Sequence, residues 1–224
     1  RGKKVGGLEE VAVYSFNHAK NLTCGEGGIV TTNDEALAER LKYSLSTFGR
    51  KQDRPWYEHH SVGFSHPLTE FQGAILMAQF ERLEEQSQKR EENARLLSRG
   101  LSEVEGVDPP HISADTTRHG WHIYVMSYHP DAFGGLPLSA FAEALEAEGI
   151  PCGGYPYPIH HNPAFDAESG RVKDSRGTFR AMPCPVAEQA CAEGTVFFTQ
   201  SMLLDEADGM NDIVTAISKV KDNA

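Results

Sequence analysis

A single lysine, Lys20, lies between an apolar stretch and a glycine-rich turn, and this arrangement could support covalent chemistry. Residues 11–16 (VAVYSF) are apolar and β-branched, which predicts a buried strand of an α/β sheet. The glycines of GEGG at 25–28 permit a sharp turn or a close approach to a ligand before a second predicted strand at 29–32. We therefore expect Lys20 on a loop between two core strands, either as a solvated surface lysine or as a functional group.

The functional interpretation is a lysine that binds an aldehyde. A lysine amine forms a Schiff base where a partly desolvated site favours its neutral form, and pyridoxal phosphate is the obvious aldehyde. Ser15 stands, buried, at the carboxyl end of the first predicted strand. Because open α/β sheets bind ligands at that edge, its hydroxyl is well placed to donate a hydrogen bond to a phosphate.

Other chemistries have weaker support in the sequence. Histidine pairs occur at 59–60 and 160–161, but adjacent side chains diverge and no HExxH pattern places two ligands on one helix face, so we expect no metal site. A serine hydrolase lacks its GxSxG turn. GEGG is not a phosphate-binding P-loop, because the lysine precedes the glycines here.

Composition limits the class of protein. The 224 residues suffice for one or two domains, and the net charge of -11 disfavours nucleic acid and anionic membranes as partners. Four cysteines without a CxxC pair, and the lack of a signal peptide or a membrane-length apolar run, predict a cytoplasmic protein. The chain opens on Arg1 and leads straight into a predicted strand, so we expect it to be the middle of a longer protein.

The first half of the chain predicts two helices separated by a long loop. Asn33 and Asp34 suit a helix N-cap, and apolar spacing continues to Gly49. Residues 50–66 show no periodicity and predict an irregular, functional loop that contacts a dimer partner or a substrate. A long helix is expected from Pro67, in its first turn, to about residue 102.

The middle of that long helix reads as polar on all sides, which predicts a bridge between two domains with a boundary near residues 80–95. In the second half of the chain, predicted strands alternate with predicted helices, which indicates a second α/β unit. We expect the following elements: a strand at 121–128, a helix at 138–149, a turn and strand entry at 149–155, and helices at 185–192 and 205–220.

Five segments resemble one protein family. The stretch SFNHAKNLTCGEGGIVTTND resembles the lysine segment of the DegT/DnrJ/StrS family of pyridoxal-phosphate sugar aminotransferases, with serine, phenylalanine, lysine and GEGG at matching spacing. TEFQGAILMAQFERLEEQ resembles the helix that follows, EGIPCGGYPYPIHHNPAF the substrate-loop region, and CPVAEQACAEG with LLDEADGMNDIVTAISKV the C-terminal end. TEFQGAIL and NPAF are most similar to the scyllo-inosose and aminohydroxybenzoate subgroups.

The resemblance implies a pyridoxal-phosphate-dependent transferase of fold type I. Residues 1–85 would be the C-terminal part of the large cofactor domain and residues 86–224 the small α/β domain. Lys20 would carry the cofactor, Ser15 would contact its phosphate, and the active site would be shared across a homodimer. The reaction would transfer an amino group from glutamate or glutamine to a keto sugar or keto cyclitol with ping-pong kinetics.

The sequence departs from the family in two places. Where the family has GxNxR, whose asparagine reaches the partner subunit's phosphate, this chain has GFSHP at 63–67. Ser65 could still donate a hydrogen bond, whereas Pro67 cannot replace the arginine. The family's cofactor glycines, stacking aromatic residue and acidic partner of the pyridine nitrogen precede the lysine strand, so this chain holds half of a site.

The resemblance also assigns substrate contacts and leaves two alternative functions. Tyr155, His160 and His161 lie in the segment that matches the substrate loop, where they either contact the substrate or pack the domain edge. One alternative is a sugar dehydratase of the same family, although such enzymes have histidine at the position of Lys20. The other is a truncated, non-catalytic protein that acts as a binding or regulatory partner.

Overall fold

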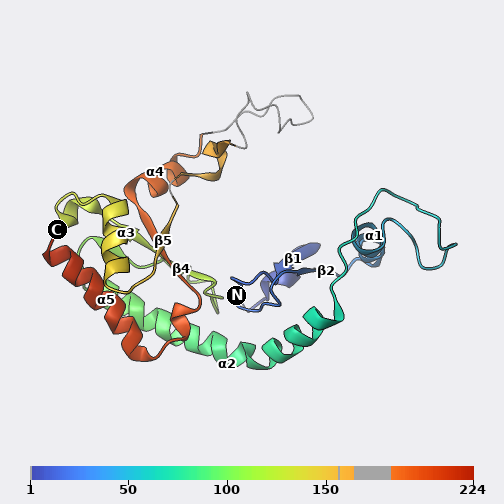
Figure 1. Ribbon diagram of the computed structural model, residues 1–224, viewed down its shortest axis with the longest axis horizontal. Coiled ribbons are helices and arrows are strands. Elements are labelled where there is room, and N and C mark those ends of the chain that lie inside the picture. Colours follow the sequence, from blue (N-terminus) through green and yellow to red (C-terminus); the bar gives the residue numbers. More distant parts are fainter. Residues whose placement is uncertain (1, 156, 164–182) are drawn as a thin grey trace. The chain divides into compact units, whose positions relative to one another are not determined.

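The structure is a computed structural model that describes residues 2–155, 157–163 and 183–224. These residues form two compact units, drawn in Figure 1 with colours that follow the sequence. The first unit comprises the residues up to Ser87 together with Ser113–Gly120, and the second comprises Gln88–Ile112 together with Trp121–Ala224.

The first unit contains an antiparallel hairpin. Strand β1 (Val11–Ser15) pairs with β2 (Gly28–Thr32), and a short 3-10 turn, η1 (Val5–Gly7), precedes it. The prediction of a buried core strand was wrong, because the Val13 side chain is 76% exposed and Ser15 is also exposed. A two-stranded sheet cannot cover its own faces, and no further strand of the described residues pairs with it.

Helix α1 (Glu35–Ser46) follows the hairpin and confirms the predicted cap. The Asp34 carboxylate accepts a hydrogen bond from the Leu37 amide at 3.0 Å, which satisfies one of the amides at the helix start. The predicted irregular loop is also confirmed, because residues 50–66 contain neither helix nor strand. Its chain folds back on the end of α1, where the His60 amide donates to the Gly49 carbonyl at 2.8 Å.

The long helix α2 (Glu70–Leu101) starts later than the sequence suggested, because Pro67 lies outside it. Thr69 and Gln72 form a capping box at its start: the Thr69 amide donates to Gln72 Oε1 at 2.9 Å, and the Gln72 amide donates to Thr69 Oγ1 at 3.3 Å. None of the helices in the described ranges, α2 included, combines the length and apolar character needed to cross a membrane.

The second unit is built on a four-stranded antiparallel sheet in the order β3-β4-β6-β5. Strand β6 was not predicted, although its alternation of buried and half-buried residues matches that of β4. The strands and helices of this unit are β3 (Val107–Asp108), β4 (Ile123–Tyr128), α3 (Leu138–Ala147), β5 (Gly153–Gly154), α4 (Pro185–Glu193), β6 (Thr195–Thr199) and α5 (Ala207–Asp222), with 3-10 turns η2 (Pro130–Phe133), η3 (Ile159–His161) and η6 (Met202–Leu204).

The core of the second unit lies between this sheet and three helices. The C-terminal part of α2, together with α3 and α5, contributes apolar residues that pack on buried side chains of β4 and β6. An aromatic group anchors it: the rings of Tyr128 and Phe141 stack at 4.2 Å, and Phe133 meets Phe141 edge to face at 5.3 Å. The sheet is therefore fixed against helices whose apolar stripes the sequence predicts.

Two polar residues of α2 are buried, contrary to the prediction that the helix middle is exposed on all sides. The Arg90 side chain is 1% exposed and donates from Nε to Gln200 Oε1 at 2.9 Å. Asn93 Nδ2 donates to the carbonyl oxygens of Leu203 and Asp205 at 3.0 and 2.8 Å. These bonds satisfy otherwise unpaired groups in the turn after β6, which explains why polar residues face this core.

We expect Gln200→Ala to lower the free energy of unfolding of this unit by about 1.5–3 kcal/mol, because it removes a hydrogen-bond acceptor from a buried cation. Glu206→Ala is the matched control, since it removes the acceptor of neighbouring Lys89 in a largely exposed ion pair and should cost less than about 1 kcal/mol. Urea unfolding of the whole chain measures both values. Equal losses for the two variants would contradict a stabilising role of the Arg90 bond.

Candidate functional site

Lys20 lies on the turn that follows β1 at its carboxyl end. The Lys20 amide donates to the Asn17 carbonyl at 2.9 Å, which closes a tight turn and leaves the side chain half-buried. The predicted loop position between two strands is confirmed, but the strands are exposed and not part of a core. The backbone turn therefore positions Lys20 at the end of the hairpin.

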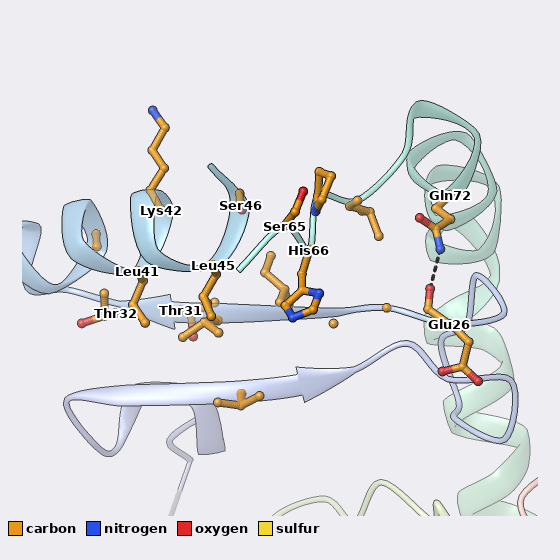
Figure 2. Close-up of a pocket in the computed structure, with 18 residues that line it drawn as sticks. Glu26, Thr31, Thr32, Leu41, Lys42, Leu45, Ser46, Ser65, His66 and Gln72 are labelled. Atoms are coloured by element: carbon orange, nitrogen blue, oxygen red, sulfur yellow. Dashed lines mark hydrogen bonds between the residues drawn. The ribbon is translucent and has the colours of Figure 1, made fainter. Parts of the chain in front are cut away.

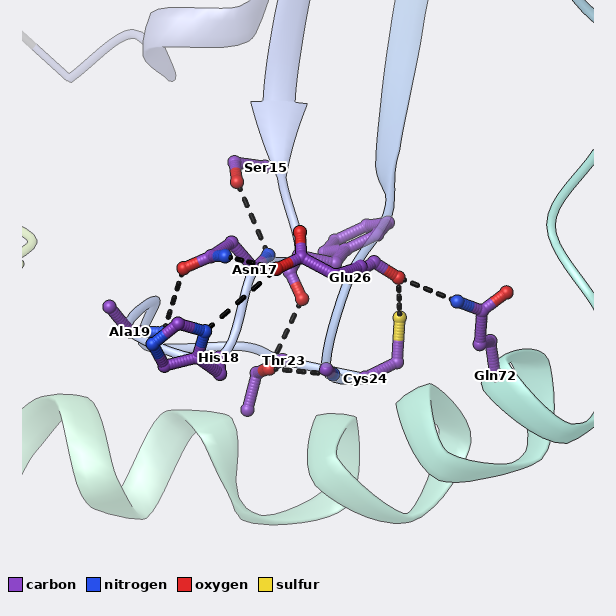
Figure 3. A network of polar contacts seen from close by, with 10 residues as sticks. Ser15, Asn17, His18, Ala19, Thr23, Cys24, Glu26 and Gln72 are labelled. Carbon is purple, nitrogen blue, oxygen red and sulfur yellow. Dashed lines mark hydrogen bonds and ion pairs between the residues drawn. The ribbon is translucent and has the colours of Figure 1, made fainter. Parts of the chain in front are cut away.

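Asn17 organises this turn through three further hydrogen bonds (Figure 3). Its amide donates to Ser15 Oγ at 3.2 Å, and its Oδ1 accepts from the Ala19 amide at 3.0 Å. Its Nδ2 donates to Glu26 Oε1 at 2.7 Å, which links the lysine turn to the glycine turn. Because Ser15 Oγ acts as the acceptor, its own O–H remains able to donate to a ligand.

The glycine turn is closed by backbone and side-chain bonds to Phe16. The Phe16 amide donates to the Gly27 carbonyl at 2.8 Å, and the Phe16 carbonyl accepts from the Cys24 amide at 3.1 Å and from Thr23 Oγ1 at 3.1 Å. A Cβ at Gly28 would lie 2.8 Å from the Tyr14 carbonyl oxygen, closer than real Cβ contacts allow. GEGG therefore serves here to bring two backbones together.

Gln72 of α2 anchors the glycine turn from the other side. Its Nε2 donates to the Glu26 carbonyl at 2.7 Å, a contact drawn in Figures 2 and 3. Its Oε1 is held by Thr69 in the capping box, so the carboxamide has a fixed orientation. The sequence did not predict that Asn17, Glu26 and Gln72 are connected by hydrogen bonds. The T-x-x-Q pattern at 69–72 was a signal for the capping box that orients Gln72.

Ser65 lines an open hollow of about 960 Å³ between the hairpin and α1 (Figure 2). The segment that carries it is fixed on α1, because the Phe64 and His66 amides donate to the carbonyls of Ser44 and Leu45 at 2.7 and 2.9 Å. Neither Ser15 nor Lys20 belongs to the lining of this hollow. Within one chain, the structure therefore joins Ser15 to the lysine turn and places Ser65 at a separate surface.

The three remaining predicted residues belong to the second unit. Tyr155 follows β5, is 46% exposed, and has its ring centroid 5.2 Å from that of Phe197. His160 and His161 lie on η3, and the expectation that their side chains diverge was wrong, since both rings turn towards Glu188 of α4. His160 Nε2 lies 2.9 Å from Glu188 Oε1, a partner that the sequence did not suggest.

Glu188 is held as a carboxylate by this arrangement. Its Oε1 accepts a hydrogen bond from the Cys184 amide at 3.0 Å, at the start of α4. That bond, followed by the bond from His160, lowers the pKa of Glu188 below its usual range. Glu188 therefore ties η3 to the first turn of α4.

Comparison with known proteins gives consistent matches over nearly the whole chain. The profile of the DegT/DnrJ/EryC1/StrS aminotransferase family matches residues 1–215. The L-glutamine:2-deoxy-scyllo-inosose aminotransferases of Streptoalloteichus tenebrarius and Micromonospora echinospora are 34% and 33% identical over 98% of this chain. The chain spans 55% of the length of each of these relatives.

Solved structures agree with this match. The structure of 3-amino-5-hydroxybenzoic acid synthase is 25% identical, with a TM-score of 0.81 over 100% of this chain and 57% of its own length. DesV from S. venezuelae, in complex with a ketimine intermediate, is 25% identical with a TM-score of 0.79 over 100% of this chain and 54% of its own length. The fold is thus that of fold-type-I transferases, of which this chain covers about half.

We expect Asn17→Ala to loosen the lysine turn, because it removes the acceptor of the Ala19 amide and the donor to Glu26. Hydrogen exchange at the Ala19 amide, measured by NMR, should accelerate by about 2- to 13-fold, the equivalent of one net hydrogen bond.

His18→Ala is the control for this measurement. It removes only a 3.9 Å contact to Glu26 between two largely exposed side chains and should leave that exchange rate unchanged. An Asn17→Ala protein with the original rate would show that backbone pairing alone holds the turn.

Proposed function

Because this chain belongs to the DegT/DnrJ/EryC1/StrS aminotransferase family, we propose that it is the part of a pyridoxal-phosphate-dependent aminotransferase that carries the reactive lysine, Lys20. The observation that carries the proposal is the family match over residues 1–215, with Lys20 on a fixed turn directly after β1. The aminotransferases of this family depend on pyridoxal phosphate.

The residues of the lysine turn fit this cofactor. Lys20 offers a primary amine for its aldehyde, and Ser15 offers a hydroxyl whose hydrogen is not used in its bond with the Asn17 amide. Asn17 links the two groups, because its amide donates to Ser15 Oγ at the end of β1 and its carbonyl accepts from the Lys20 amide. Ser65 would serve the phosphate of a partner subunit, which agrees with its position outside the lysine turn.

Bound pyridoxal phosphate would supply an electron sink that stabilises the negative charge on a carbon that loses its proton. Lys20 would act as general base and then as general acid: its Nζ would take the proton from the α-carbon of the amino donor and later return a proton to the carbon that receives the amino group. The keto acid formed from the donor would leave before the acceptor binds, so ping-pong kinetics follow.

For the substrates, we propose glutamine as the donor and a keto cyclitol as the acceptor. The support comes from the names of the relatives in S. tenebrarius and M. echinospora, which specify L-glutamine and 2-deoxy-scyllo-inosose. Substrate contact by Tyr155, His160 and His161 stays a prediction. Tyr155 is exposed and offers a hydroxyl close to β5, whereas His160 Nε2 is already bonded to Glu188.

The two units suit a division between a large and a small domain. We assign residues 1–85 to the large cofactor domain and residues 86–224 to the small domain, and the separation of the compact units near Ser87 supports this boundary. A homodimer is part of the proposal, supported by large apolar side chains on the 50–66 loop: Trp56 is 75% and Tyr57 80% exposed. The four cysteines, which form no disulfide, support a cytoplasmic location.

We expect Lys20→Ala to abolish conversion of glutamine to its keto acid. The assay uses the natural full-length protein, supplied with pyridoxal phosphate and the keto cyclitol. The loss should be at least about 1,000-fold, since the variant lacks both the covalent anchor and the proton carrier. Lys219→Ala, on the surface of α5, is the control and should retain full activity. Activity in Lys20→Ala near that of the control would exclude the proposed role.

A further inference from the structure

His160, His161 and Glu188 form a cluster in the second unit, and a hydrogen bond joins only two of these three side chains. His160 Nε2 lies 2.9 Å from Glu188 Oε1, whereas His161 Nε2 lies 4.0 Å from the same oxygen, beyond hydrogen-bond range. One ligand atom from each of the three residues lies within 4.8 Å of the others. The second imidazole is thus brought to the carboxylate without bonding to it.

From this geometry we propose that His160, His161 and Glu188 form a site for a divalent transition-metal ion of the Zn²⁺ class. Two imidazole nitrogens and one carboxylate oxygen form a donor set that Zn²⁺ accepts, and three protein ligands leave a fourth position for water. Nothing in the proposed transfer chemistry requires this ion, so the inference goes beyond the proposed function.

The separations suit a shared ion. Ligands bound at about 2.0–2.1 Å in tetrahedral geometry stand about 3.4 Å from one another. The distances of 2.9 and 4.0 Å to Glu188 Oε1 lie on either side of this value, so small side-chain rotations would bring all three atoms to an ion. The two rings already cross edge to face, with centroids 4.3 Å apart and planes at 65°.

The surroundings supply charge, orientation and access. The Glu188 carboxylate is oriented by the Cys184 amide, the type of second-layer bond that fixes metal ligands. Side-chain exposures of 53% for His161 and 37% for Glu188 leave the cluster open to ions from solvent. The ion would join η3 to the first turn of α4, and its binding would replace the bond between His160 and Glu188.

The experiment is equilibrium dialysis of the untagged chain, free of added cofactor, against Zn²⁺, with Co²⁺ absorption as a second readout of coordination. We expect one ion per chain at micromolar Zn²⁺, and a weakening of at least about 100-fold in His161→Ala and in Glu188→Gln. His161→Ala preserves the bond between His160 and Glu188, which holds η3 against α4. A loss of Zn²⁺ binding in this variant therefore reports on the ion site and not on the attachment of η3. Circular dichroism checks that both variants fold.

The matched control is Asp108→Asn, which alters another close histidine–carboxylate pair, His129 with Asp108 at 2.6 Å. Only one histidine contacts that carboxylate among the described residues, so the variant should bind Zn²⁺ as the unchanged chain does. Absence of binding at micromolar Zn²⁺, or equal binding by His161→Ala, would overturn the proposed site. Formation of the cofactor adduct on Lys20 is measured separately and does not depend on either result.

Discussion

The backbone pairing between Phe16 and the glycine turn is the constraint on which the lysine site depends. Two bonds, from the Phe16 amide to Gly27 and from the Cys24 amide to the Phe16 carbonyl, close the connection between β1 and β2. Only a residue without a side chain fits at Gly28, because a Cβ there would collide with the Tyr14 carbonyl. Backbone bonds therefore hold the two ends of the connection that carries Lys20, and side chains organise the turn between them.

Side chains then connect this turn to its neighbours within the first unit. Asn17 joins the lysine turn to Glu26, and Gln72 joins the Glu26 carbonyl to the start of α2 (Figure 3). These residues orient the chain and need not touch a reacting atom. The same division holds in the second unit, where buried Arg90 and Asn93 satisfy the turn after β6 and so fix the sheet against α2.

The sequence correctly predicted the elements for which the capping residue or the apolar spacing is a clear local signal. Asp34 before an amphipathic stretch gave the start of α1 correctly, and the apolar spacing of residues 205–220 predicted α5. The sequence-based prediction was wrong where the burial of a residue depends on a partner that is distant in the sequence. Arg90 and Asn93 look like solvated helix residues until Gln200 and the following turn are placed beside them.

The candidate site follows the same rule. The sequence was enough to propose Lys20 and Ser15, because that proposal depends on local spacing and on a resembling segment. The orientation of Asn17 and Gln72 depends on contacts with Glu26, which is distant in the sequence. The exposed face of β1 has a different cause. The apolar pattern that predicts burial is present, but a two-stranded sheet leaves Val13 uncovered in this chain, which spans about half the length of its relatives.

The central claim is that Lys20 holds pyridoxal phosphate. The most direct measurement is borohydride reduction of the purified natural protein with pyridoxal phosphate, followed by intact mass and peptide mapping. The account predicts one reduced adduct per chain on the peptide that contains Lys20. An unmodified Lys20 peptide, with adducts scattered over surface lysines such as Lys219, would contradict it.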